Sequence, residues 1–330
     1  MAAHNGVGLM VGVAHNGERS VFSYGETSKG SGRKPDSKTL FQIGSITKIF
    51  TAELLADAVR HGKAQLNDPL KKYFPRAHVP VYGEREITLL DLATHTSGLP
   101  RNIGKWQRPT ATIQDMLNFL SSYRLTRAPG ERYEYSNLAF ALLGHALAHA
   151  ANTNWAAIVH REIVVPLQLR DTTIELNPDQ SARSAQGYGA RGNPAPLHSN
   201  LWPMMAPAGG LYSTMDDMLD FLAYNMGERQ TPLSDLLPMM HQARHAGPKP
   251  QTEIGLGWEI RQTPNREIIW KNGATPGFHS YIGFNPSTKT GIVVLTNSAM
   301  KPAPFVSAVF SQFKMSPVEN PDDDEATSDE

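Results

Sequence analysis

The stretch FQIGSITKIF, residues 41–50, contains a serine three residues before a lysine. Ser45 follows Gly44 and opens an amphipathic helical pattern over residues 46–62. In such a helix Lys48 lies one turn beyond Ser45 on the same face, within reach of its hydroxyl. A lysine in dry, cationic surroundings can help a serine to become a nucleophile. The alternative interpretation is a helix cap followed by a solvated lysine.

The same spacing occurs at Ser31 and Lys34, inside the segment SKGSGRKPDS. Glycine, proline and the lack of apolar periodicity predict an exposed loop there. A loop does not hold two side chains in a fixed relation, so we interpret this copy as accidental.

Two further elements support the first interpretation. Tyr135-Ser136-Asn137 stands at the entrance of another expected helix, where alone it would be only a helix cap. Lys271-Asn272-Gly273 ends an apolar strand, and small residues follow that let a ligand lie against the backbone. A literal KTG at residues 289–291 belongs to NPSTKTG, which predicts a turn between two strands and is rejected. The three remaining elements, in this order, favour a serine nucleophile assisted by basic groups.

Strand and helix patterns are unevenly distributed along the chain. Strand-like runs occur near both ends, with a hairpin turning at HNGE, and are found at residues 6–25, 255–262, 267–273, 279–286 and 291–297. Helical patterns fill the middle, at residues 112–123, 137–151, 155–165 and 214–226. The expected fold class is α/β, with an antiparallel sheet formed from both chain ends, flanked by helices, and an inserted mainly helical lobe.

These patterns also predict domain boundaries. Residues 6–60 and 205–313 form the expected sheet domain, and residues 61–204 form the helical lobe. The acidic residues 314–330 are expected to be a disordered tail.

The chain resembles serine hydrolases of the class C β-lactamase and penicillin-binding peptidase group, of the AmpH type, which also includes carboxylesterases. The resemblance runs from Gly6 to Phe313 and includes phrases outside the three elements. These phrases are LNDPLKKYFP, ITLLDLATHTSGLP, PGERYEYSNLAFALLGHAL, APAGGLYSTMDDM and GLGWEI.

The resemblance implies a role for each matching position. Ser45 would be the nucleophile that accepts the acyl group, Lys48 its proton partner and Tyr135 a base or proton shuttle. Asn137 would hold the substrate amide, and Lys271 would tune Tyr135 and attract a substrate carboxylate. The remaining positions implied to contact substrate are Asn272, Gly273 and Ala274, with an oxyanion hole formed by the backbone N–H groups of Ser45 and Ala274.

The sequence departs from this family pattern in two places. The group usually begins with a helix before the first strand, whereas here a strand begins at about Gly6. Asn272 stands where the group carries threonine or serine, whose hydroxyl commonly contacts the carboxylate of a β-lactam. The second departure predicts slow turnover of β-lactams.

Composition excludes several classes of partner. The 31 basic and 31 acidic side chains balance, so nothing points to nucleic acid or to an anionic membrane surface. There is no cysteine, and no apolar run approaches the roughly 18 residues of a membrane helix. The expected partner is a small-molecule or peptide substrate, and no oligomeric state is indicated. A periplasmic or secreted location would follow if a leader segment precedes this chain, and a cytoplasmic location otherwise.

Histidine and tryptophan residues provide further candidates. The pairs His145 with His149 and His241 with His245 have metal-chelating spacing but lack a glutamate motif and a third ligand, so no metal or other cofactor is expected. His95 and His279 are candidates for the cleft, either as hydrogen-bonding or as catalytic residues. Trp106, Trp202 and Trp258 are candidates for lining a groove, with ordinary packing as the alternative.

The expected function is acyl transfer to Ser45 followed by hydrolysis. Three substrate classes compete: peptides of D-amino acids, β-lactams and small esters. The alternative is a penicillin-binding or sensor protein that becomes acylated and does not turn over.

Overall fold

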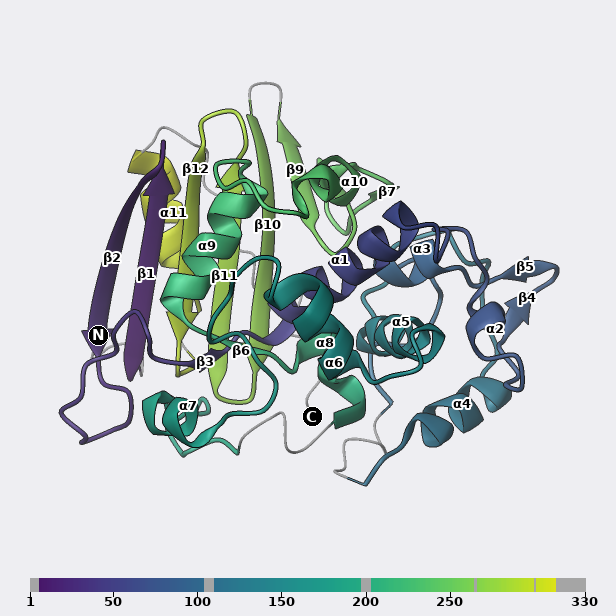
Figure 1. The fold of residues 1–330 in the computed structure, drawn as a ribbon, viewed down its shortest axis with the longest axis horizontal. Helices are drawn as coiled ribbons and strands as arrows, with labels where there is room; N and C mark the ends of the chain where they lie inside the picture. The colour runs from purple at the N-terminus through teal and green to yellow at the C-terminus, as the bar shows by residue number, and fades with distance from the viewer. Residues whose placement is uncertain (1–5, 104–109, 197–202, 264–265, 300, 313–330) are drawn as a thin grey trace.

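The computed structural model describes residues 6–103, 110–196, 203–263, 266–299 and 301–312. Its largest element is an eight-stranded antiparallel sheet with the order β2-β1-β12-β11-β10-β9-β8-β7 (Figure 1). The strands are β1 (Gly8–His15), β2 (Glu18–Gly25), β7 (His245–Ala246), β8 (Thr252–Ile254), β9 (Glu259–Thr263), β10 (Arg266–Thr275), β11 (Phe278–Asn285) and β12 (Thr290–Thr296). The expected sheet built from both chain ends is therefore confirmed.

Pairing of β1 with β12 joins the two ends of the chain. Leu9 lies opposite Thr296, and His15 lies opposite Thr290. The hairpin from β1 to β2 turns at Asn16 and Gly17, whose φ angles are 48° and 82°. Asparagine and glycine tolerate these positive values, which two-residue hairpin turns require. The predicted turn at HNGE is confirmed.

Helices cover both faces of the sheet. Figure 1 shows α9 (Met215–Asn225) in front of the strands and α11 (Ala303–Gln312) behind them. A Cβ on Gly12 of β1 would lie 2.5 Å from the sulfur of Met215, and one on Gly291 of β12 would lie 2.8 Å from Leu222. These glycines let α9 approach the sheet closely. Behind the sheet, Val306 of α11 packs in a separate apolar cluster with Val11 and its neighbours.

The remaining helices lie beside the sheet, mostly in the middle of the chain. The α-helices are α1 (Thr47–Arg60), α2 (Leu70–Tyr73), α3 (Leu89–Ala93), α4 (Ile113–Ser122), α5 (Asn137–Ala150), α6 (Trp155–Val159), α7 (Pro178–Arg183), α8 (Ala206–Gly209) and α10 (Leu237–His241). A π-helical turn, η4 (His160–Val164), continues α6, and the 3₁₀ turns are η2 (Gly44–Ile46), η5 (Pro203–Met205) and η6 (Ser234–Leu236). Small two-stranded sheets pair β3 (Phe41–Gln42) with β6 (Tyr212–Ser213) and β4 (Val81–Tyr82) with β5 (Arg85–Glu86).

Side-chain caps explain where several of these helices begin. Thr88 and Thr112 each form a capping box, with Asp91 and Asp115 respectively. Ser136 accepts a hydrogen bond from the N–H of Ala139 at 3.0 Å and so fixes the start of α5.

Helix α1 differs from its prediction. The segment was expected to be amphipathic, yet every residue from Thr47 to Asp57 is buried. The reason is position: α1 packs against α5, α8 and η4 and runs through the centre of the molecule, so it has no solvent face over these three turns (Figure 1).

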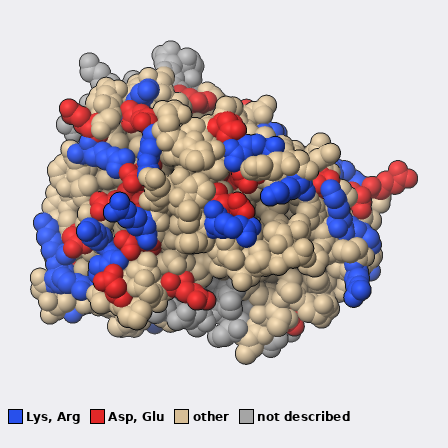
Figure 2. Space-filling view, viewed as in Figure 1, with Lys and Arg blue, Asp and Glu red and all other residues tan. Residues whose placement is uncertain are grey.

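Charges of both signs are interspersed over the face in Figure 2, as the zero net charge leads one to expect. Among the described residues, every helix is too short or too polar to cross a bilayer.

Candidate active site

Ser45 lies in the 3₁₀ turn η2, directly before α1, and is 8% exposed. Gly44 has a φ of +49°, and a Cβ there would lie 2.7 Å from the backbone nitrogen of Ala274. A Cβ on Gly273 would lie 2.9 Å from the backbone nitrogen of Ser45. Because both positions lack a side chain, β10 lies directly against the serine turn. The backbone of Ala274 is thereby brought next to Ser45.

Lys48 reaches back from the first turn of α1 to Ser45. Its Nζ donates hydrogen bonds to Ser45 Oγ at 3.0 Å, to Asn137 Oδ1 at 2.8 Å and to the carbonyl oxygen of Ala208 at 2.7 Å. The lysine is fully buried. Three acceptors for one ammonium group compensate for its removal from water.

Tyr135 completes the hydrogen-bonded group. Its hydroxyl lies 2.7 Å from Ser45 Oγ. Three cationic groups lie close to the centroid of its ring: Lys48 Nζ at 4.9 Å, Lys271 Nζ at 5.1 Å and the Arg101 guanidinium carbon at 4.7 Å. Positive charge at these distances stabilises negative charge on the phenol oxygen.

Lys271 enters the site from β10 and forms an ion pair with Glu259 of β9. The distance from Nζ to Glu259 Oε1 is 2.8 Å, and both side chains are buried. The two side chains are 2% and 7% exposed, so the charge of Lys271 is largely balanced within the protein rather than by water. This carboxylate was not among the residues that the sequence analysis selected.

Asn137 begins α5, and its amide nitrogen donates to Asn102 Oδ1 at 2.8 Å. Asn272 is 7% exposed. Neighbouring residues of a strand leave it on opposite faces, so the side chains of Lys271 and Asn272 diverge from β10. Contact of Asn272 with substrate stays a prediction.

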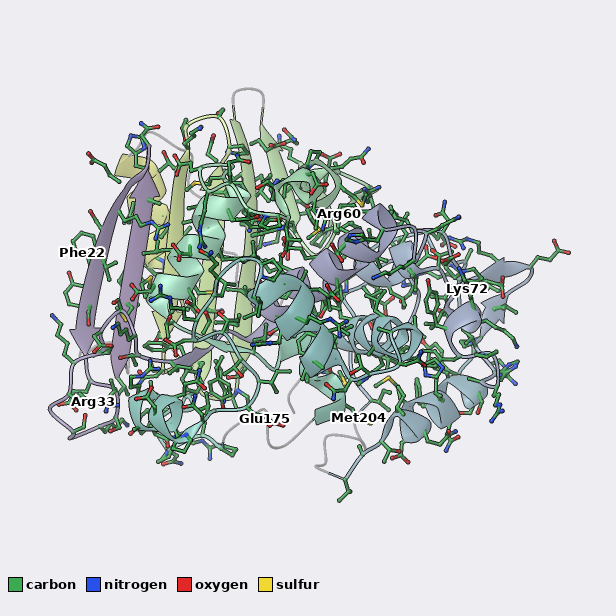
Figure 3. All side chains as sticks on the ribbon, viewed as in Figure 1. Phe22, Arg33, Arg60, Lys72, Glu175 and Met204 are labelled. Atoms are coloured by element: carbon green, nitrogen blue, oxygen red, sulfur yellow. The ribbon has the colours of Figure 1, made fainter. Side chains whose placement is uncertain are left out.

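The two rejected copies lie outside this group. Ser31 and Lys34 are exposed, in the loop where Arg33 is labelled at the edge of the molecule in Figure 3. Lys289 has a φ of 45° and ends the turn that leads into β12.

His95 and His279 both lie beside the group. His279 stands opposite Ala274 in the pairing of β11 with β10, and its Nδ1 lies 3.1 Å from the carbonyl oxygen of Ser298. His95 is fully buried and stacks on Tyr135.

The spaced histidine pairs make ordinary protein contacts. His145 Nε2 bonds to the carbonyl oxygen of Met204 at 2.8 Å, and burial lowers its pKa. The ring of His149 lies against Phe74. His241 bonds to Asn225 Oδ1 at 3.1 Å, and burial lowers its pKa to about 4.

His245 Nε2 lies 3.1 Å from the carbonyl oxygen of Gly130. Within the described parts of the chain, no group of three histidine or carboxylate side chains is placed to hold a metal ion. Trp258 is fully buried in the main core, whereas Trp106 and Trp202 lie outside the described residues.

Sequence reasoning missed three components of the site. Glu259 lies in the family phrase GLGWEI, but its spacing from other residues does not mark it as part of the site. The carbonyl oxygen of Ala208 is a backbone group, and the type of residue does not reveal that it accepts a hydrogen bond from Lys48. Arg101 follows the phrase ending in GLP, and only the fold shows that its guanidinium lies over Tyr135.

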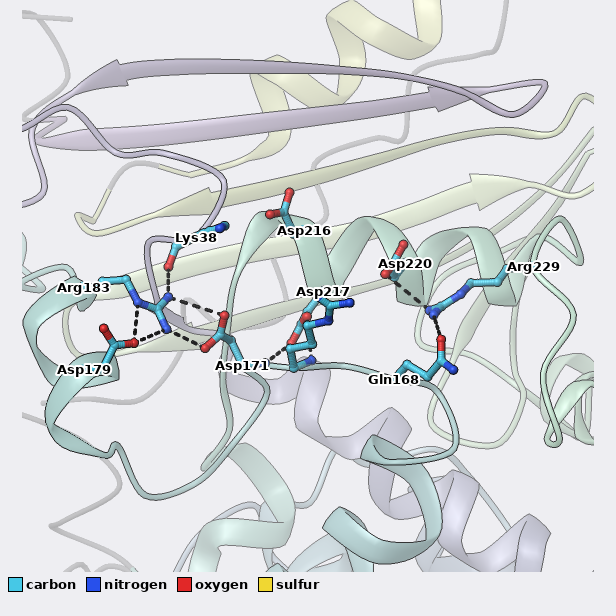
Figure 4. Close-up of a pocket in the computed structure, with 10 residues that line it drawn as sticks. Lys38, Gln168, Asp171, Asp179, Arg183, Asp216, Asp217, Asp220 and Arg229 are labelled. Carbon is cyan, nitrogen blue, oxygen red and sulfur yellow. Dashed lines mark hydrogen bonds and ion pairs between the residues drawn. The ribbon is translucent and has the colours of Figure 1, made fainter.

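A separate charged pocket of about 510 Å³ lies beside α7 and the start of α9 (Figure 4). Arg183 bonds there to Asp171 and Asp179, and Arg229 bonds to Gln168. The charged side chains that line the pocket are largely paired with each other, and the lining includes no serine, histidine or tyrosine. We therefore interpret the pocket as an ion-pair network that connects α7, α9 and the intervening loops.

Comparisons with known proteins agree with this geometry. The family model described as Beta-lactamase matches residues 1–309. The D-alanyl-D-alanine-carboxypeptidase/endopeptidase AmpH of Escherichia coli strain K12 is 34% identical, over 89% of this chain and 80% of that protein.

Solved structures give the same result. A class C beta lactamase from Rhodobacter sphaeroides superposes with a TM-score of 0.80 at 27% identity, covering 90% of this chain and 91% of that one. The D-alanine carboxypeptidase AmpC from Burkholderia cenocepacia gives a TM-score of 0.79 at 29% identity, covering 91% of each chain.

Proposed function

Because this chain belongs to the beta-lactamase family and is a serine hydrolase, we propose that Ser45 is its nucleophile and that Lys48 and Tyr135 move the proton. The observation that carries the proposal is the continuous hydrogen-bonded group from Lys48 Nζ through Ser45 Oγ to the Tyr135 hydroxyl. Both contacts are within the 2.6–3.2 Å over which a proton is transferred directly.

In the acylation step Ser45 Oγ attacks the substrate carbonyl carbon as its proton passes to the oxygen of Tyr135, which starts the step as a phenolate. The negative oxygen that develops is stabilised by the backbone N–H groups of Ser45 and Ala274, which the two glycines bring together. The bond to the leaving amine or alcohol then breaks, and the leaving group takes the proton. Lys48 keeps Ser45 and Tyr135 in place and favours the ionised form of the phenol.

In the deacylation step water attacks the acyl carbonyl, and Tyr135 accepts a proton from it. Breaking of the ester bond releases the carboxylic acid product, and the proton returns to Ser45 Oγ. The cycle returns the three side chains to their starting state.

We propose amide bonds in peptides of D-amino acids as the main substrate class. The support is the AmpH relative, named as a D-alanyl-D-alanine carboxypeptidase and endopeptidase, which matches over most of both chains.

A second class, uncharged short-chain esters, is favoured by the ion pair between Lys271 and Glu259. Because Glu259 balances its charge, Lys271 attracts a substrate carboxylate only weakly. An uncharged ester has no carboxylate and does not need this attraction. β-Lactams, which carry that carboxylate, would then be acylating but slow substrates.

Incubation with a fluorescent penicillin, followed by intact-mass measurement over time, tests both nucleophile and substrate class. We expect a covalent adduct that decays slowly, together with release of D-alanine from a peptide ending in D-alanyl-D-alanine. A fleeting adduct would instead indicate a β-lactamase, and an adduct without release of any product would indicate a binding protein.

The matched serine variants locate the adduct. Ser45→Ala is expected to abolish the adduct and all hydrolysis, whereas Ser31→Ala, in the exposed loop, is expected to change neither. Acylation of the Ser45→Ala protein would refute the assignment.

A further inference from the structure

His95 holds the chain at Tyr135 through three contacts. Its carbonyl oxygen accepts a hydrogen bond from the N–H of Glu134 at 2.7 Å. Its Nδ1 accepts one from the N–H of Ser136 at 3.0 Å. Its imidazole ring stacks on the Tyr135 ring, with a centroid distance of 4.4 Å and an interplanar angle of 28°. One histidine therefore contacts the residue before Tyr135, Tyr135 itself and the residue after it.

The backbone of His95 adopts the conformation that these contacts need. Its φ angle is +59°, in the left-handed region that few residues other than glycine occupy. Two hydrogen bonds of the next residue maintain it: the N–H of Thr96 donates to the carbonyl of Asp91 at 2.9 Å, and the N–H of Gly130 donates to the carbonyl of Thr96 at 2.8 Å. Such strained residues persist where the surroundings fix them, and they cluster at functional sites.

The contacts also define the protonation state of the ring. Nδ1 accepts a hydrogen bond, so the proton of the neutral ring is on Nε2. Burial, followed by the charges of Lys271, Lys48 and Arg101, lowers the pKa of His95 well below its ordinary value. A proton on Nδ1 would point at the N–H of Ser136 and break the bond between them.

We propose that His95 is a positioning residue: as a neutral imidazole it holds the Tyr135 hydroxyl against Ser45 Oγ. The proposal rests on the proposed role of Tyr135 in proton transfer. The ring of His95 is covered by Tyr135, Tyr133 and Phe140 and is buried, so it acts through the tyrosine and does not contact the substrate.

The expected effect follows from the distance between the two oxygens. The hydroxyl of Tyr135 is 2.7 Å from Ser45 Oγ, and a displacement of about 1 Å costs on the order of 100-fold in rate. Asn137, the expected substrate contact, is held separately by Lys48 and Asn102. Loss of the His95 ring is therefore expected to lower kcat and to leave KM nearly unchanged.

Three substitutions separate the contacts of the ring. His95→Gly permits the positive φ and keeps the backbone carbonyl, so it removes only the side chain. His95→Asn tolerates the same φ and offers an acceptor oxygen without the ring. His95→Phe keeps stacking and has no acceptor.

The measurements are single-turnover acylation and steady-state hydrolysis of a p-nitrophenyl ester, with the melting temperature of each variant. We expect His95→Gly to acylate about 10- to 100-fold more slowly than the wild type at unchanged KM. His95→Asn and His95→Phe should each recover part of the rate. His145→Asn, which alters a half-buried histidine outside the site, should acylate at the wild-type rate.

Tyr135→Phe distinguishes failure of this inference from failure of the proposed function. If Tyr135→Phe is slow while folded His95→Gly acylates normally, the positioning role is wrong and the role of Tyr135 stands. If Tyr135→Phe itself acylates normally, the proton pathway is wrong. A rise in KM with an unchanged acylation rate in the His95 variants would show that His95 contacts the substrate, which also overturns the inference.

Discussion

Tyr135 lies close to most of the charged side chains of the site. Its ring has three cationic groups around it and a neutral histidine stacked on it. Since the histidine is kept neutral, it adds contact without adding a fourth positive charge. Lys48, in turn, is fixed by acceptors from α5 and α8. Each group that we propose to carry the proton therefore also has contacts with residues that have no proposed part in the reaction.

Removal of either proton-carrying residue should slow the formation of the acyl-enzyme. Lys48→Ala and Tyr135→Phe are each expected to lower the acylation rate by on the order of 100-fold or more, the range of general acid–base groups. Because the two groups interact through Ser45, the double variant should lose less than the product of the single losses. Stopped-flow acylation by an ester and by an amide measures all three. Ordinary turnover of both substrates by Tyr135→Phe would show that the tyrosine is only structural.

Whether Asn272 contributes to specificity, as predicted, can be measured directly. An amide side chain offers a carbonyl that repels a carboxylate, whereas a threonine hydroxyl can donate to one. Asn272→Thr is expected to raise kcat/KM for a penicillin relative to a p-nitrophenyl ester by about 1–3 kcal/mol. An unchanged or lowered ratio would mean that Asn272, which leaves β10 on the opposite face from Lys271, does not reach the substrate.

At the scale of single elements, strand and helix periodicity predicted most of the sheet and its flanking helices. Runs rich in apolar residues and the HNGE turn located the strands of both chain ends, although β12 is buried at every residue and β2 is exposed at almost every one. The SxxK spacing located Ser45 and Lys48 because three residues make one helical turn. At α1 periodicity predicted the helix correctly, but not its burial: every residue from Thr47 to Asp57 is buried, so the expected solvent face is absent there.

Glu259 and His95 show why the rest of the site needed the fold. Glu259 meets Lys271 only because β9 pairs with β10, and no sequence spacing encodes that register. His95 was recognised as a candidate, but its proposed role depends on a left-handed backbone and on a contact across 41 residues of chain. Contacts between residues far apart in the sequence cannot be predicted from local sequence patterns.

The contact of α1 with α9 buries a carboxyl group that should make stability depend on pH. Glu53 is 1% exposed, and neither carboxyl oxygen has a hydrogen-bond partner of ordinary geometry among the described residues. Burial raises its pKa from 4.5 to about 8; the nearby Tyr224 hydroxyl opposes this shift and the Asp57 charge adds to it. The folded protein therefore keeps a proton that the unfolded chain releases.

Glu53→Gln is expected to flatten the pH dependence of stability. In the wild type the contribution of Glu53 is fully present below about pH 4.5 and is lost as pH rises to about 8, at up to about 1.4 kcal/mol per pH unit. Urea unfolding at pH 5 and pH 8 measures the slope. Glu175→Gln, at the exposed residue labelled in Figure 3, is the control and should retain the wild-type slope. An equal slope in Glu53→Gln would show that Glu53 is already ionised in the folded protein.

At the scale of the whole molecule, the site lies where the sheet meets the helices. Ser45 comes from η2, Lys48 from the first turn of α1, Lys271 from the sheet and Asn137 from α5. Helix α1 packs against α5, α8 and α10. The division into a sheet domain and a helical lobe stays a prediction, and the central position of α1 argues that both parts depend on one helix for their stability.

Phe50 tests whether the two parts unfold together. This side chain of α1 is fully buried and stacks on Phe221 of α9, with a centroid distance of 4.5 Å. Phe50→Ala should cost about 3–5 kcal/mol, the range for truncating a buried phenylalanine. Because α1 contacts both parts, we expect one calorimetric transition at a lower temperature, with faster amide exchange in β10 and α5 alike.

The control for Phe50→Ala is another aromatic truncation at an exposed position. Tyr82 in the β4–β5 hairpin is 47% exposed, so Tyr82→Ala should change stability by no more than about 0.5 kcal/mol. Two calorimetric transitions, of which Phe50→Ala shifts only one, would show that the sheet and the helices fold as separate units. Catalysis would then depend on how two independent units dock, since Ser45 and Asn137 would belong to different ones. A single shifted transition means instead that α1 connects the stability of the fold to the geometry of the site.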